Sequence, residues 1–303
     1  MTDPVAGPPG PRPFRFLLDE AIRLSRQHFR SIYWSVAIPI AVVATLISAL
    51  QAFWFGRVME DLGTGQPPLF SPSVLIMTFI YMLLMMVAYN AMQVAAVDAL
   101  AGRPVDMGRA WRFTLQPRVL GTLVIWYVCT IAAVLCCIIP GLYVGPLLAF
   151  VPQAMIEEGR FGPDALSRSA ELTRYNPSRQ IAESPLVKIF LLFLVGIMVS
   201  YVIAILVALP FQIPMYLDIF RQAASGGEPT LERMPFYMWL QVPAQFLNAL
   251  ASTAVYLYLC FGTALLFFDT RGRKEGVDLR AAIDTVFGGP PPPPPPYPDL
   301  PLT

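Results

Sequence analysis

The sequence predicts an all-α integral membrane protein with six transmembrane helices arranged as three hairpins, each preceded by an amphipathic interfacial helix on the cytoplasmic side. Its 303 residues are 56% apolar and only 14% charged, which leaves little material for a soluble domain beside a membrane bundle. Six apolar runs follow one another, and most are long enough to cross a hydrocarbon layer of about 30 Å as helices. The runs are 32–55, 74–97, 119–139, 142–156, 186–209 and 236–268.

The basic residues lie on one side of this pattern. When the segments between the runs are assigned alternately to the inside and the outside, all but three of the 21 Lys and Arg residues lie inside. The exceptions are Arg57, Arg221 and Arg233. Because cytoplasmic segments retain Lys and Arg during insertion, this asymmetry predicts an even number of spans with both termini in the cytoplasm.

A basic amphipathic stretch precedes the first, third and fifth runs. Residues 14–30 read FRFLLDEAIRLSRQHFR, in which apolar residues at helical spacing alternate with arginines. Comparable stretches occur at 102–118 and 163–181. An apolar stripe with a basic flank is typical of a helix lying in the membrane interface. The chain therefore reads as one unit used three times, which suggests a pseudo-threefold organisation.

Prolines punctuate the apolar runs. Pro140 and Gly141 interrupt the stretch 119–156, which is too long for one span, so we interpret them as the tight outer turn of the middle hairpin. Each proline inside a run removes a backbone hydrogen bond and predicts a kink. These prolines are Pro39, Pro146, Pro152, Pro210, Pro214 and Pro243.

Both ends of the chain are rich in proline. Residues 1–13 form a Pro-rich N-terminus that we expect to be disordered, residues 14–287 form the six-span membrane domain with its interfacial helices, and residues 288–303 form a cytoplasmic tail. The tail contains an unbroken run from Pro290 to Pro296, followed by Tyr297. Such a run adopts extended polyproline II, which aromatic grooves bind. The tail is therefore either a flexible extension or a docking element for a cytoplasmic protein.

The runs offer few groups for catalysis, because apart from Lys188 near the start of the fifth run they lack Asp, Glu, Lys, Arg and His. The single histidine, His28, is expected to be solvated, and neither a paired-carboxylate motif nor a phosphate loop nor a Ser-His-Asp set is present. We therefore expect neither enzymatic activity nor a cofactor. The cysteines are interpreted as packing residues, with a metal or redox site as the alternative. They are Cys129, Cys136, Cys137 and Cys260.

A dense group of charged residues near the inner ends of the fourth and sixth runs is the first candidate site. It is either an ion-pair network that fixes the interfacial helices or a pocket for anionic lipid headgroups. Within it, Asp269 is expected to be the partner of Arg168 or Arg271. The candidate residues are Glu158, Arg168, Ser169, Arg174, Asp269, Arg271, Arg273 and Lys274.

A polar face on the sixth run is the second candidate site. Gln241, Gln245, Asn248 and Ser252 follow helical spacing and lie on one continuous face. Such residues serve either to hydrogen-bond neighbouring spans or to line a polar cleft.

Three segments carry a family resemblance. They are LLDEAIRLSRQHFRSI at 17–32, the segment 136–174 with its Pro-Gly, Glu-Gly and Ala-Leu-x-Arg-Ser pattern, and LLFFDTRGRKEGVDL at 265–279. In this order they resemble a broad bacterial family of uncharacterised six-span membrane proteins, related to the membrane domain fused to some glycerophosphoryl diester phosphodiesterases. The resemblance implies the six-span fold in a bacterial inner membrane. It implies no activity, because the phosphodiesterase chemistry of the fused proteins belongs to a separate soluble domain.

Two functions remain open from the sequence. The leading one is a noncatalytic scaffold or accessory protein of the inner membrane that binds lipid. The alternative is a transporter or permease-like component for an apolar or lipid substrate, which would use the kinked hairpins and the polar face. Expected partners are membrane lipids, a cytoplasmic protein at the tail, and a second membrane protein or another copy of the chain. Nucleic acid is not expected.

Overall fold

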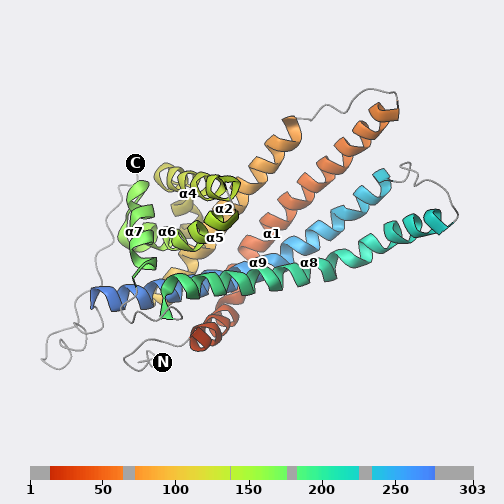
Figure 1. Ribbon diagram of the computed structural model, residues 1–303. Helices are drawn as coiled ribbons and strands as arrows, with labels where there is room; N and C mark the ends of the chain where they lie inside the picture. Colours follow the sequence, from red (N-terminus) through yellow and green to blue (C-terminus); the bar gives the residue numbers. More distant parts are fainter. Residues whose placement is uncertain (1–13, 64–71, 137, 176–182, 225–233, 277–303) are drawn as a thin grey trace, which may run out of the picture.

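The computed structural model describes residues 14–63, 72–136, 138–175, 183–224 and 234–276 (Figure 1). Within these ranges the regular secondary structure is α-helical, which confirms the all-α part of the predicted fold class. The predicted disordered N-terminus at 1–13 and the polyproline tail at 288–303 lie outside the described residues.

Five of the described helices are long and apolar enough to cross a membrane. They correspond to five of the six apolar runs, so the chain has the character of a multi-pass membrane protein. These helices are α1 (Phe14–Gly63), α2 (Pro72–Leu100), α4 (Pro117–Cys136), α8 (Pro185–Ala224) and α9 (Met234–Glu275).

The first basic stretch and the first apolar run form one continuous helix. Helix α1 has 50 residues, and at a rise of 1.5 Å per residue it is about 75 Å long, more than twice the thickness of a hydrocarbon layer. The sequence from Phe14 to Ile38 contains neither Gly nor Pro, so nothing interrupts the helix between the two segments. The separate interfacial helix predicted at 14–30 is therefore the first part of α1.

Besides α4, the chain between α2 and α8 forms four short helices. They are α3 (Met107–Thr114), α5 (Ile138–Leu147), α6 (Val151–Glu158) and α7 (Pro163–Thr173). Figure 1 shows α4 to α7 gathered at one end of the molecule, while α1, α8 and α9 extend from it. The second and third basic stretches thus contribute the separate helices α3 and α7, in contrast to the first.

The fourth apolar run is divided between α5 and α6. Pro152 lies in the first turn of α6, where a missing N–H is tolerated. The break would leave the Leu147 carbonyl and the Phe150 N–H without partners. The Ser169 hydroxyl of α7 donates to the Leu147 carbonyl at 2.8 Å and accepts from the Phe150 N–H at 3.1 Å. Thr173 also donates to the Leu147 carbonyl, at 3.2 Å. Because α7 satisfies these backbone groups, a broken helix is stable in this place.

Pro140 and Gly141, predicted to form the outer turn of the middle hairpin, lie in a helix instead. Helix α4 ends at Cys136 and α5 begins at Ile138, so Pro140 and Gly141 lie in the first turn of α5. Helices α4 and α5 pack together closely at this point. A Cβ atom on Gly141 would lie 2.6 Å from the Val134 Cγ2 atom and 3.0 Å from its Cα atom. Glycine is therefore needed here for close packing of two helices.

Helix α9 is the centre of the long-helix bundle, with α1 on one side and α8 on another (Figure 1). Small residues on α1, namely Ala37, Ala41 and Ala44, are buried against the core and permit a close approach. On the α8 side, Gly196 faces Leu259 and Gly262 faces Leu192, so close that an added Cβ would lie 2.7 and 2.8 Å from a leucine methyl group. Small residues that let helix backbones approach are the usual packing device in membranes.

Candidate functional site

A group of charged side chains joins α6, α7 and α9 at one end of the molecule. We call it the inner ion-pair network. Glu158 ends α6, Arg168 and Glu171 lie on α7, and the last turns of α9 supply the remaining members. The network consists of Glu158, Arg160, Arg168, Glu171, Arg271, Lys274 and Glu275.

Arg168 is the central residue of this network. Its Nε and Nη2 atoms donate to the two Glu158 oxygens at 2.8 and 2.9 Å, and it also bonds to Glu275 of α9 and, at 3.3 Å, to Glu171. The side chains of Arg168 and Glu158 are each only 8% exposed. Burial opposes the charge of Arg168, but the bonds to Glu158 and Glu275 outweigh it and raise its pKa above the usual value.

The turn between α6 and α7 brings Glu158 and Arg168 together. Gly159 and Gly162 both adopt a positive φ, of 61° and 62°, which residues with a Cβ rarely accept. Around this frame the other charges are paired as well. Arg160 Nε lies 3.1 Å from Glu158, and Arg271 Nε lies 3.0 Å from Glu275.

A bond to Lys274 lowers the pKa of Glu171, which lies on the exposed side of α7. The acidic groups of the network are therefore already neutralised by its basic groups. An anionic headgroup at the central Arg168 would have to displace Glu158 or Glu275 from it. The geometry accordingly favours the ion-pair interpretation of this site over the headgroup interpretation.

Four predicted members of the first candidate site, among them both Asp269 and Arg273, lie outside this network. Asp269 pairs with Arg273 one helical turn away on α9, and not with Arg168 or Arg271. Ser169 is buried and bonds to the break between α5 and α6. Arg174 is exposed at the end of α7. The expected partner of Asp269 was wrong: Arg273, one turn further along α9, pairs with it, while Arg168 and Arg271 both pair with Glu158 and Glu275.

A second charged group, which we call the Asp98 cluster, joins α2, α3 and α6. Asp98 is fully buried at the end of α2, and Arg103 Nε donates to it at 2.8 Å. Arg103 also pairs with Glu157 of α6, and Arg109 of α3 lies 3.5 Å from Asp98. The sequence reasoning missed this cluster because Asp98 lies one residue beyond the second apolar run. An acid at the end of a span, five residues before an arginine, was the available signal.

A buried polar node lies one to two turns deeper. Gln93 of α2 donates to the hydroxyls of Tyr89 and Thr263, at 2.7 and 3.0 Å. Gln153 of α6 donates to the Gln93 carbonyl oxygen at 2.7 Å. Three helices are therefore linked by side-chain hydrogen bonds inside the bundle, the use of polar residues expected between spans.

The predicted polar face on α9 is not part of this node. Gln241, Asn248 and Ser252 are partly buried, and Gln245 is exposed. The Asn248 Oδ1 atom is buried without a hydrogen-bond partner in the part of the chain that the structure describes. Other polar side chains join α9 to its neighbours: Tyr237 donates to Asp218 of α8, and Thr263 accepts from Gln93 of α2 and Gln153 of α6.

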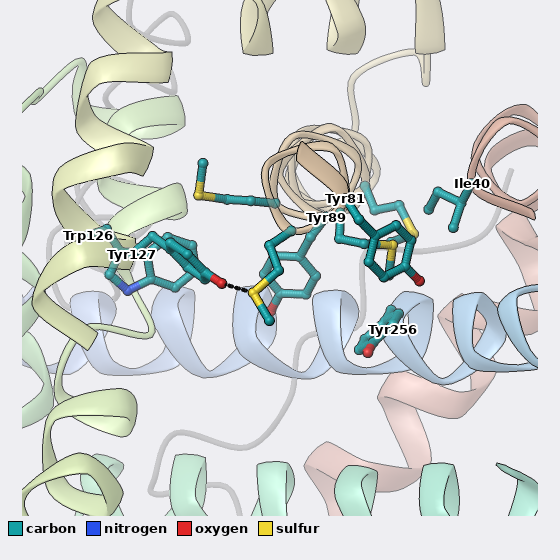
Figure 2. A pocket seen from close by; sticks show the side chains of 10 residues that line it. Ile40, Tyr81, Tyr89, Trp126, Tyr127 and Tyr256 are labelled. Carbon is teal, nitrogen blue, oxygen red and sulfur yellow. Dashed lines mark hydrogen bonds between the residues drawn. The ribbon is translucent and has the colours of Figure 1, made fainter. Parts of the chain in front are cut away.

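An apolar pocket of about 390 Å³ lies between α1, α2, α4 and α9. In Figure 2, Trp126 and Tyr127 of α4 border it on one side, Ile40 of α1 lies on the opposite side, and Tyr256 of α9 lies below. Tyr127 donates to the Met82 sulfur across the pocket. The remaining lining residues all belong to α2, and they are Tyr81, Met82, Met85, Met86, Tyr89 and Met92. The sequence signal for this pocket was the Met- and Tyr-rich segment 81–92.

The cysteines and the histidine are dispersed. Cys129 and Cys136 are exposed, Cys260 is buried, and Cys137 lies outside the described residues. His28, predicted to be solvated, is partly buried and stacks on Phe261 with ring centroids 6.0 Å apart. Among the residues with a described structure, no group of three or more His, Cys, Asp or Glu side chains is placed to hold a metal ion.

Comparison of the chain with family models, with curated proteins and with solved structures found no match. The function is therefore argued from the geometry of the chain itself.

Proposed function

We propose that this chain is a noncatalytic scaffold or accessory protein of a bacterial inner membrane, which crosses the membrane six times with both termini in the cytoplasm and binds lipid. In this arrangement α5 and α6 together form the fourth crossing, interrupted at Leu148 to Phe150. The observation that carries the proposal is the meeting of the charged ends of α2, α6 and α9 on one side of the molecule. These ends are the inner ends of the second, fourth and sixth crossings.

The pairing of these charges supports a structural role. Arg168 and Glu158 bond to each other, and the Asp98 cluster joins α2 to α3 and α6 in the same way. Ion pairs of this kind fix helices against one another and leave no free nucleophile or base at the centre of the network. Helix α8, by contrast, exposes many large apolar side chains, from Ile197 to Phe220, to its surroundings. Such a face suits contact with lipid or with an apolar helix of a partner.

A transporter for an apolar or lipid substrate is the second candidate function. The observation that favours it is the pocket of about 390 Å³ within the bundle. The helices around the pocket include α1 and α9, and each contains a proline in its interior. A proline kink is a common place for a helix to bend during a conformational change.

The six-span topology predicts a definite labelling pattern. In a cysteine-free variant, single cysteines at Thr64 and Ser225 should react with a membrane-impermeant thiol reagent in intact cells, because both fall in outside segments. Cysteines at Ser167 and Thr285 should react only after the cells are opened. Mass spectrometry of the labelled protein provides the measurement. Labelling of Ser167 from outside would exclude the proposed topology.

The accessory role predicts specific copurification. Purification of the full-length chain from native membranes in mild detergent should retain lipids and at least one further protein, both identified by mass spectrometry. A variant that ends at Phe287 should insert and retain the membrane-embedded partners, but should lose any soluble protein that binds the polyproline tail. A chain that retains neither lipid nor protein above the level of an unrelated multi-pass control would contradict the accessory role.

A further inference from the structure

A second pocket, which we call the α8–α9 pocket, lies where the end of α8 meets the beginning of α9. Figure 1 shows these helix ends at the opposite end of the molecule from α4 to α7. The volume of the pocket is about 460 Å³, which falls within the range of roughly 300–1,000 Å³ that is common for small-molecule sites. Apolar, acidic and basic side chains share its lining, so it suits a ligand with both apolar and charged parts. The lining residues are Pro214, Leu217, Asp218 and Arg221 of α8, and Phe236 and Tyr237 of α9.

The surroundings of the α8–α9 pocket have the character of a membrane–water interface. Large aromatic side chains are exposed on the helix turns around it, and tyrosine and tryptophan are enriched at such interfaces. They are Tyr216, Phe220, Phe236 and Trp239. Along α8 the exposed side chains are apolar or aromatic from Ile197 to Phe220, and the next one is Arg221. In the membrane placement of the proposed function, Arg221 therefore lies at the depth where lipid phosphate groups begin.

Arg221 and Asp218 place opposite charges three residues apart on the α8 wall of the pocket. Side chains at this spacing on a helix have Cβ atoms about 5–6 Å apart. Arg221 is exposed and forms no ion pair among the described residues. Asp218 accepts a hydrogen bond from the buried Tyr237, and a carboxylate has further lone pairs for a second donor. The wall thus offers a guanidinium fork for a phosphate and, one helical turn away, an acceptor for an ammonium group.

The two charges together select the class of ligand. A purely anionic headgroup would be attracted by Arg221 and repelled by Asp218, and a purely cationic one would meet the reverse. A headgroup with a phosphate and a primary ammonium group two carbon atoms apart offers each side chain its counter-charge. The exposed side chains of Leu217 and Ile213, one and two turns back along α8, provide an apolar surface for the acyl chains of the same molecule.

We propose that the α8–α9 pocket binds the headgroup of a membrane phospholipid that carries an ethanolamine group, with its phosphate on Arg221 and its ammonium on Asp218. The inference rests on the lipid binding of the proposed function and names the lipid, but it does not depend on which side of the membrane the pocket faces. The labelling and copurification results can therefore fail while this binding stands. The reverse also holds, because lipid bound elsewhere on the chain and a retained protein would still support the accessory role.

The experiment measures lipid binding to the purified full-length chain in detergent by native mass spectrometry. Ethanolamine and glycerol phospholipids with identical acyl chains are titrated separately, so only the headgroup differs. Wild type should bind the ethanolamine lipid about fivefold more tightly, because the glycerol lipid has no ammonium for Asp218. Arg221→Gln should weaken binding of both lipids about fivefold, since it removes the phosphate contact. Asp218→Asn should bring the two lipids to equal affinity, because an amide oxygen still accepts from Tyr237 but no longer attracts an ammonium.

Arg57→Gln is the matched control. Arg57 is an exposed arginine on the same side of the membrane in the proposed topology, but it lies on α1, over the Phe53 ring, and is not part of the pocket lining. This variant should bind both lipids as wild type does.

A soluble competitor identifies the source of the headgroup. Glycerophosphoethanolamine, which has the same headgroup without acyl chains, should not displace the lipid at equal concentration, because it gains nothing from Leu217 and Ile213. Four results would overturn the proposal: equal wild-type affinity for the two lipids, wild-type binding by Arg221→Gln, an unchanged ethanolamine preference in Asp218→Asn, or displacement by the soluble headgroup, which would identify a free phosphodiester as the ligand.

Discussion

Arg168→Ala is expected to lower the free energy of unfolding by about 3–5 kcal/mol, the cost of breaking a buried ion pair from one side. Arg168 bonds to Glu158, Glu171 and Glu275, and its loss would leave the buried Glu158 without its main partner. The measurement is unfolding in detergent, followed by accessibility of the buried Cys260 thiol to a reagent. The same experiment on Arg168→Lys should give a smaller loss, because lysine keeps the charge but not the two-pronged bond to Glu158.

Arg23→Ala is the control for this prediction. Arg23 pairs with Glu20 one turn away on α1, but its side chain is 57% exposed. Exposed pairs contribute little to stability, so this variant should unfold almost as wild type does. The double variant Arg168→Met with Glu158→Leu should recover part of the loss, since removing both charges leaves neither buried alone. Equal stability of Arg168→Ala and wild type would refute the structural role of the network.

Phe150→Ala is expected to cost a comparable amount, about 3–5 kcal/mol, because it removes a fully buried aromatic ring. Phe150 lies between α5 and α6 and packs edge-to-face on Phe267 of α9, with ring centroids 5.7 Å apart. The cavity left behind should loosen the contact of the α5–α6 junction with α9. Thermal unfolding in detergent provides the measurement.

Phe220→Ala is the matched control for Phe150→Ala. The Phe220 side chain, on α8, is 77% exposed, so its removal creates no internal cavity. Its stability should remain close to that of wild type. If the two variants lose equal stability, the junction between α5 and α6 does not pack as the structure describes.

The fold class was predictable because long apolar runs have few solutions in a membrane. Hydropathy alone located α2, α4, α8 and α9, and the basic stretches located α3 and α7. The continuity of α1 was harder to predict. A basic amphipathic segment and a span are both helical, so the sequence pattern is the same whether they form one straight helix or two helices that meet at an angle. Kinks were predicted at Pro146 and Pro152, but the complete break between α5 and α6 was not, because it depends on hydroxyls of Ser169 and Thr173 that are distant in sequence.

The composition of the candidate site was predictable in part. A concentration of charge near Glu158 and the end of α9 was evident, and the structure brings Glu158, Arg168, Arg271 and Lys274 into one network. The partners were not evident, since they depend on how the turn at Gly159 and Gly162 orients α7. The Met- and Tyr-rich segment 81–92 was a signal for part of the apolar pocket lining, but that pocket itself was not predictable, because its walls come from four helices whose relative rotation is a tertiary property.

In the proposed six-span topology, the break between α5 and α6 has a consequence for the order of assembly during synthesis. The carbonyl of Leu147 is satisfied by hydroxyls that lie 22 and 26 residues later in the chain. When the segment α5–α6 first leaves the ribosome, these residues have not yet emerged, and its open backbone groups disfavour transfer into hydrocarbon. The segment therefore has to wait, beside the insertion machinery or the earlier helices, until α7 has been made and has docked. Insertion of this crossing is a cooperative event that the following helix completes.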